Sequence, residues 1–113
     1  MTEHLSIPSE LGAVTISTDA VAQIVEHTAA ECYGVVGLEA PSLAGKLLRK
    51  DGIQIGAHDG TLRIALHVAI EHGLNLAEVA STVRSRVAYE VERMTGVGVD
   101  AVEVHIQKVK RSA

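Results

Sequence analysis

The sequence predicts a two-layer sandwich of the α+β class, with a small mixed or antiparallel sheet of about four strands and two main helices on one face. Three observations support this prediction. Residues 53–58 and 61–70 alternate apolar and polar side chains around Asp59-Gly60, a preferred hairpin turn. Two stretches repeat apolar residues at the helical period. A last alternating stretch, residues 101–107, precedes a basic tail.

Length and composition predict one domain with its own core. The chain has 113 residues, of which 47% are hydrophobic. We expect a flexible leader over residues 1–11, a single domain over 12–109 and a basic tail over 110–113. No secretion signal and no apolar run near ~20 residues is visible, so we expect a soluble protein without a membrane span. Phe and Trp are absent and only Tyr33 and Tyr89 are aromatic, which excludes an aromatic platform for stacking bases.

The first elements follow from local signals. Residues 12–17 alternate weakly and predict a short edge strand. The side chain of Ser17, Thr18 or Asp19 is suited to cap a first helix, and Gly34 is suited to end it. The residues that recur at the helical period, and that we expect to form its buried stripe, are Val21, Ile24, Val25, Thr28 and Cys32.

The middle of the chain contains the clearest and the least clear segments. Residues 35–38 read as a short strand that Pro41 ends, whereas residues 42–50 fit either one amphipathic turn or a loop. In the hairpin, one face of the second strand is apolar, and the other face is polar and lined by small side chains. The apolar face comprises Leu62, Ile64, Leu66, Val68 and Ile70.

The second helix and the last strand complete the expected layers. Asn75 and Glu78 resemble a capping box, and Gly96 is placed to end the helix. Arg86 and Glu90 are spaced for an ion pair one turn apart. The expected buried stripe comprises Leu76, Val79, Ala80, Val83, Val87, Val91 and Met94. In the last strand we expect Val102, Val104 and Ile106 to face inward. If this strand lies beside residues 62–70, the connection makes the sheet mixed.

Six histidines raise the possibility of a metal site. Across a two-residue turn His58 pairs opposite Thr61, so His67 lies roughly 20 Å along the strand and cannot share an ion with it. His67 and His105 would be neighbours if their strands pair, with Glu71 or Glu103 close by, and two imidazoles with a carboxylate suit zinc. The simpler expectation is solvated strand histidines, and a pH-responsive surface lies between the two.

Catalytic signatures are absent from the sequence. Cys32, the single cysteine, allows no internal disulfide, and it falls on a buried stripe at the carboxyl end of a helix, where a thiolate is disfavoured. The chain has no serine elbow, no HExxH and no phosphate-binding loop with its lysine. We therefore expect a protein that is not an enzyme, with no catalytic residues, no bound metal and no cofactor.

A nucleic-acid-binding module is the main alternative from the residues themselves. Gly34-Val35-Val36-Gly37 matches the GxxG of KH domains, and Lys46, Arg49 and Lys50 could add a basic footprint. The two valines read as a buried strand rather than as a KH loop, and a pI near 5.8 opposes strong binding to phosphates.

Charge is distributed unevenly along the chain. Residues 1–45 contain six acidic side chains and no Lys or Arg, whereas residues 46–113 contain ten basic and eight acidic side chains. Two differently charged solvated faces explain this pattern, and so does an acidic end that meets a basic surface on a neighbouring copy or a partner.

The order of these motifs resembles the alkaline shock protein family, the envelope stress response proteins of Gram-positive bacteria. The resemblance covers about residues 12–109. Its segments are Glu31-Cys32-Tyr33-Gly34-Val35-Val36-Gly37, the Asp59-Gly60 hairpin, Glu71-His72-Gly73-Leu74-Asn75-Leu76-Ala77-Glu78-Val79-Ala80, Val91-Glu92-Arg93-Met94-Thr95-Gly96 and the strand from Val102 to Val109. This chain departs from the family at His72, where an aromatic residue is common, and it lacks a long charged tail.

The resemblance implies a non-enzymatic stress or scaffold protein of the cell envelope. Such a protein is cytoplasmic, associates with itself as a homo-oligomer, and is held at the inner membrane face by a small membrane-spanning partner. Control of a fatty-acid synthesis enzyme is a further role that the resemblance implies. We expect the contact surface on the sheet face away from the helices. The partner-binding candidates are Arg63, His67, Glu103 and His105, with Lys46, Arg49 and Lys50 outside the sheet.

Overall fold

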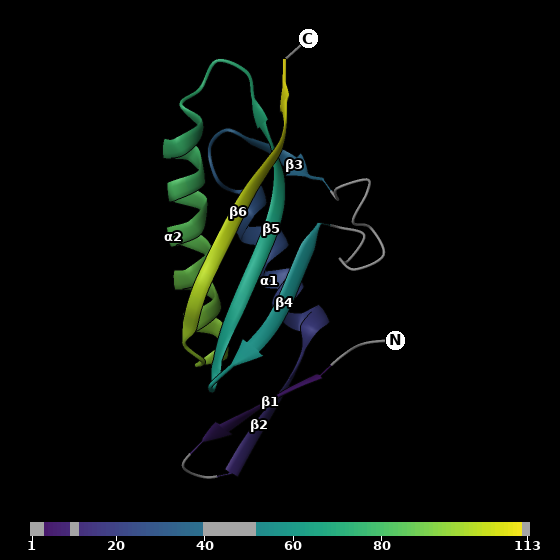
Figure 1. Ribbon diagram of the computed structural model, residues 1–113, viewed down its shortest axis with the longest axis vertical. Coiled ribbons are helices and arrows are strands. Elements are labelled where there is room, and N and C mark those ends of the chain that lie inside the picture. Colours follow the sequence, from purple (N-terminus) through teal and green to yellow (C-terminus); the bar gives the residue numbers. More distant parts are fainter. Residues whose placement is uncertain (1–3, 10–11, 40–51, 112–113) are drawn as a thin grey trace.

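The computed structural model describes residues 4–9, 12–39 and 52–111. In chain order its elements are β1 (His4–Ser9), β2 (Gly12–Ser17), α1 (Thr18–Ala30), β3 (Val35–Leu38), β4 (Ile53–His58), β5 (Thr61–Glu71), α2 (Leu76–Thr95) and β6 (Val99–Lys110). Four strands form the main sheet, and in the view of Figure 1 α1 lies behind it while α2 runs alongside β6. The predicted two-layer α+β sandwich, with a mixed sheet and both helices on one face, is therefore confirmed.

β5 is the centre of the main sheet. It pairs antiparallel with β3 and β4 and parallel with β6. β4 pairs with residues 61–66 of β5 and β3 with residues 68–70, so these two short strands follow one another along the same edge of β5. β6 covers the opposite edge from residue 62 to residue 71. Every other strand of the sheet is thus positioned by β5.

The local signals that define the helices act as predicted. The Ser17 hydroxyl accepts a hydrogen bond from the Ala20 N–H at 3.0 Å, and the Asn75 side chain accepts one from the Glu78 N–H at 3.1 Å. Gly96 ends α2 in the left-handed conformation, with φ 74°. The hairpin turn also has positive φ at both positions, 49° for Asp59 and 81° for Gly60.

The core lies between the inner face of the sheet and the two helices. Val21 and Val25 of α1 are fully buried, as are Val83, Val87 and Val91 of α2. The inner face of β5 contributes the large apolar side chains Leu62, Ile64, Leu66, Val68 and Ile70. Because the chain has no Phe or Trp, burial of these aliphatic side chains supplies most of the hydrophobic stabilisation of the core.

Several expectations about local structure are wrong. The leader expected over residues 1–11 contains β1, which pairs with β2 in a separate hairpin that extends beyond one end of the main sheet (Figure 1). α1 ends at Ala30, four residues before Gly34. Leu76 and Met94, expected in the buried stripe of α2, are exposed, 36% and 58% respectively. They lie in the first and last turns of the helix, outside the buried stretch from Val79 to Val91. The predicted segment 42–50, including Pro41 before it, lies outside the described residues.

Candidate interaction surface

The sheet face turned away from the helices, called the outer face below, is the candidate site. Because side chains alternate along a strand, the residues between the core positions of β4, β5 and β6 point to this side. They are Gln54, Gly56, Arg63, Ala65, His67, Ala69, Ala101, Glu103, His105 and Gln107. No helix among the described residues covers this face, which is turned toward the viewer in Figure 1.

A shallow hollow of about 270 Å³ lies on the outer face, in the half nearest the turn between β4 and β5. Its floor is formed by small side chains on three neighbouring strands, Gly56, Ala65 and Ala101, and its rim includes Gln54 and Glu103. Small residues at these positions flatten the sheet and leave backbone close to the surface. The hollow can accept a side chain from a partner.

Arg63 stands at the rim of this hollow and is held by an ion pair. Its Nε donates to Asp100 at 2.9 Å, and its side chain is 56% exposed. A guanidinium has five N–H donors, so the pair with Asp100 leaves donors for a partner. The charge of Arg63 is therefore fixed in position and accessible.

His67 and His105 are brought together, as the sequence predicted they would be if their strands paired. They are register partners across β5 and β6, and their rings stack with centroids 4.6 Å apart and planes 14° apart. His67 Nδ1 lies 3.0 Å from Gln107 Oε1. The expectation of solvated strand histidines is wrong for His67, which is only 9% exposed, since His105 and Gln107 lie against it.

The stacked arrangement is unsuited to binding one metal ion through both rings. An imidazole binds a metal in the plane of its ring, and two nearly parallel planes share no such point near the rings. Glu103 approaches His105 Nε2 at 3.5 Å, whereas the described residues contain no group of three or more His, Cys, Asp or Glu placed to hold an ion. The zinc arrangement considered for this pair thus requires a different orientation of at least one ring.

An ion-pair bridge closes one end of the outer face. Lys110 Nζ lies 2.8 Å and Lys108 Nζ 4.0 Å from the Glu39 carboxylate, which follows β3. The hydrogen bond from Lys110 is the main cause that lowers the pKa of Glu39. Ala69 of β5, which pairs with β3 on one side and with Lys108 of β6 on the other, is fully buried. The acidic first part of the chain therefore meets the basic last part within one molecule at this point.

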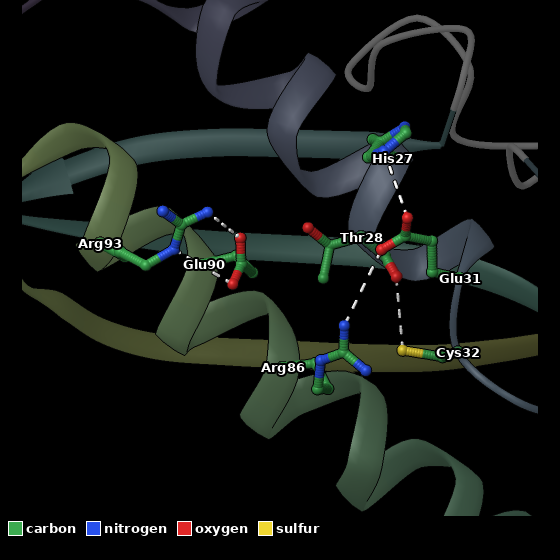
Figure 2. Close-up of polar contacts among 7 residues, drawn as sticks. All are labelled: His27, Thr28, Glu31, Cys32, Arg86, Glu90 and Arg93. Carbon is green, nitrogen blue, oxygen red and sulfur yellow. Dashed lines mark hydrogen bonds and ion pairs between the residues drawn. The ribbon is translucent and has the colours of Figure 1, made fainter.

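The opposite, helical side has a groove of about 530 Å³ between α1 and α2. Figure 2 shows the polar contacts beside it. Arg86 Nη2 lies 3.8 Å from Glu31, and Arg93 Nη2 lies 2.8 Å from Glu90. The predicted pair between Arg86 and Glu90 is thus replaced by two others, because Arg86 reaches the C-cap residue of α1 and Glu90 pairs with Arg93 on its own helix.

Cys32 lies beneath these ion pairs and is buried. Its thiol donates to the Thr28 carbonyl oxygen at 3.4 Å (Figure 2), and its exposed fraction is 5%. Burial raises the pKa of this thiol, while Arg86 lowers it by less and Glu31 raises it. A buried, protonated thiol is a poor nucleophile, as its position on the helix stripe predicted.

The GxxG match does not form a KH-type loop. Gly34 has φ 91° and precedes β3, in which Val35 and Gly37 pair with β5 while Val36 lies at a register shift between them. Val36 is nonetheless 54% exposed, so the reading of both valines as buried is wrong for one of them. The basic candidates Lys46, Arg49 and Lys50 lie outside the described residues.

Comparison with known proteins identifies the family. Residues 6–111 match the model of the alkaline shock protein 23 family, described as having a cell envelope-related function. The chain belongs to this family. The resemblance to alkaline shock proteins noted from the sequence is thereby confirmed. The chain is also 26% identical to the uncharacterized protein YloU of Bacillus subtilis, with 94% of this chain and 95% of that protein aligned.

A second relative agrees with this result, and several solved structures share the fold. The uncharacterized protein Spy1614 of Streptococcus pyogenes serotype M6 is 27% identical, over 94% of each chain. A variant of MamM CTD has a TM-score of 0.61 at 12% identity, covering 82% of this chain and 99% of that one. The copper form of MamM CTD gives 0.60 at 12% identity, covering 85% and 97%. At this identity the MamM structures share the fold alone with the alkaline shock chain.

Neither helix of the described residues is both long enough and apolar enough to cross a membrane.

Proposed function

We propose that this alkaline shock family protein is a non-enzymatic scaffold at the inner face of the cell envelope. It acts by associating with further copies of itself and by binding a small membrane-spanning partner. The observation that carries the proposal is the outer face, a sheet surface that no described helix covers and that bears a hollow of small side chains. Open sheet faces of this kind pack well against a flat partner surface.

The partner-binding residues are those with exposed charge around the hollow. Arg63 offers a fixed guanidinium, and Glu103 and His105 are exposed beside it, 70% and 46% respectively for their side chains. His67, stacked against His105, keeps that ring in place. Lys46, Arg49 and Lys50 remain a prediction as additional contacts with a partner.

The catalytic alternative receives no support from the geometry of the described residues. The one thiol is buried with a raised pKa, and three of the exposed histidines, His27, His58 and His105, each lie beside a single carboxylate. Cell envelope-related function is shared by the family, and binding rather than catalysis is the chemistry that the outer face offers.

The proposal is tested by reversing charge on the outer face. Arg63→Glu combined with His105→Glu should weaken self-association and membrane co-sedimentation by at least about tenfold, about 1.4 kcal/mol, since like charges across an interface repel. The matched control is Arg84→Glu combined with His72→Glu, which makes the same changes on exposed residues of α2 and of the loop before it. Circular dichroism confirms that both proteins fold.

Light scattering reports the oligomer, and sedimentation with membranes is measured with and without the co-expressed partner. The partner is identified by capture from native cells. Unchanged association and co-sedimentation in the folded outer-face variant would contradict the proposal. Salt-sensitive binding of nucleic acid that disappears when Lys46, Arg49 and Lys50 become Glu would favour the KH-like alternative instead.

A further inference from the structure

β6 is a long strand with one free edge. It spans twelve residues, and among the described elements only β5 pairs with it. It forms the outermost strand of the main sheet in Figure 1. An exposed strand edge is a row of unpaired N–H and C=O groups that can extend the sheet by pairing with another chain.

The register identifies which groups point to the free edge. The Leu62 N–H donates to the Gly98 carbonyl, and the His67 N–H donates to the Gly52 carbonyl, each at 2.9 Å. Successive residues of a strand direct their N–H and C=O to opposite edges, so even-numbered residues 62–70 of β5 face β6. In the parallel register, the residues of β6 directly opposite them point their N–H and C=O away from β5. Those residues are Val99, Val102, Val104, Ile106 and Val109. The Val99 N–H donates to Glu92 Oε2 at 2.8 Å, and Val109 lies beyond a register shift, so Val102, Val104 and Ile106 are called the free residues below.

We propose that β6 pairs antiparallel with β6 of a second copy of this chain, around a two-fold axis at Val104. This inference rests on the self-association proposed above and names its interface. The axis joins Val104 of the two copies and sets Val102 opposite Ile106, so all three free residues form edge hydrogen bonds. Residues 101–106, around this centre, pair with residues 63–68 of β5 without a register shift. The result is one continuous sheet through both copies, a closed and symmetric dimer.

The charge order of β6 fits this pairing with itself. Acidic residues precede Val104, and basic residues follow it. The axis sets Glu103 opposite His105 of the second copy and brings Asp100 near Lys108 of the second copy, so that unlike groups meet twice on each side. Cross-strand pairs of opposite charge stabilise a sheet, and like charges directly opposite destabilise it.

Other registers lose this match. Moving the axis to Val102 sets Glu103 opposite Ala101, and moving it to Ile106 sets Glu103 opposite Val109. Fewer of the three free residues then meet each other. The charges along β6 therefore favour the register centred on Val104 over these two.

The first test removes the central edge donor. Val104→Pro deletes an N–H that does not bond to β5, and proline is tolerated in an edge strand at such a position. The expected result is an unchanged circular dichroism spectrum and a dimer dissociation constant at least about tenfold higher in sedimentation equilibrium.

The second test exchanges charge and does not depend on proline. Asp100→Lys or Lys108→Asp alone should weaken the dimer, and the two together should recover most of the association. The double variant does not restore the pairs of Asp100 with Arg63 or of Lys108 with Glu39 within one copy. Recovery can therefore come only from contacts across the axis.

The outcomes separate this inference from the scaffold proposal. If the unmodified protein associates and the folded Val104→Pro and charge-reversed proteins associate equally well, the β6 interface is wrong and the scaffold proposal stands. Loss of association in Arg63→Glu alone, with no loss in the β6 variants, would assign the contact to the outer face and overturn the inference. A protein that stays monomeric at every concentration contradicts both.

Discussion

Substitution of Gly34 by alanine tests whether the GxxG segment is structural. Gly34 has φ 91°, a conformation that L-residues rarely adopt. A Cβ at this position would lie 2.7 Å from Leu74 Cδ1 and 3.2 Å from Val79 Cγ2. The close approach of the β3 entry to the start of α2 therefore requires glycine for two separate reasons.

The expected decrease in the free energy of unfolding can be estimated from these two costs. The backbone conformation costs about 1–2 kcal/mol for an alanine. Overpacking typically costs about 1–3 kcal/mol. We expect a cost in the lower half of this range here, because the Leu74 methyl group can rotate away from the added Cβ. A less flexible unfolded chain offsets about 0.4–1 kcal/mol. We expect Gly34→Ala to lower the free energy of unfolding by about 2–3 kcal/mol, measured by urea denaturation.

Gly60→Ala is the matched control. Gly60 has φ 81° but no atom within 4 Å of the added Cβ, so only the backbone cost applies, about 1 kcal/mol after the offset. An equal loss in the two variants would refute the steric argument, and no loss in either would refute the conformational one. A stable Gly34→Ala protein that loses only nucleic-acid binding would restore the KH interpretation.

Two further predictions concern titrating groups. Because burial raises the pKa of Cys32, its thiol should react with Ellman's reagent far more slowly in the folded protein than in urea at neutral pH, and equal rates would contradict the buried position. Because Lys110 lowers the pKa of Glu39 in the folded state, this group stabilises the fold above the carboxyl's ordinary pKa and loses that effect as pH falls through the lowered value. Melting temperature should therefore fall less on acidification in Glu39→Gln than in the unmodified protein.

The elements that sequence predicts well are those with local causes. Ser17 and Asn75 cap their helices through hydrogen bonds three residues away, and Asp59-Gly60 supplies the two positive φ angles of its turn. The sequence also predicted that His67 and His105 would be neighbours if their strands paired, and β5 and β6 do pair. In each case the deciding contact lies within one turn or follows from strand periodicity.

The features missed depend on contacts between distant segments. Residues 4–9 were expected to belong to a flexible leader, yet they form β1 through antiparallel pairing with β2. His67 is buried by side chains 38 and 40 residues away, a consequence of the register between strands. Arg86 pairs with Glu31, the residue that caps the carboxyl end of α1, rather than with Glu90 on its own helix. No local pattern encodes these contacts.

The outer face and the free edge of β6 are compatible surfaces rather than competing ones. Pairing of two β6 strands around Val104 keeps the helices of both copies on the same side of the joined sheet, because an antiparallel two-fold axis runs perpendicular to it. The two hollows of small side chains then lie on one continuous outer face. A dimer built this way presents two copies of Arg63 to the same partner surface. Two weak contacts linked in one dimer bind a membrane-held partner far more strongly than either contact alone. Self-association and partner binding, two properties that the family resemblance implies, would thus be coupled by the geometry of a single sheet.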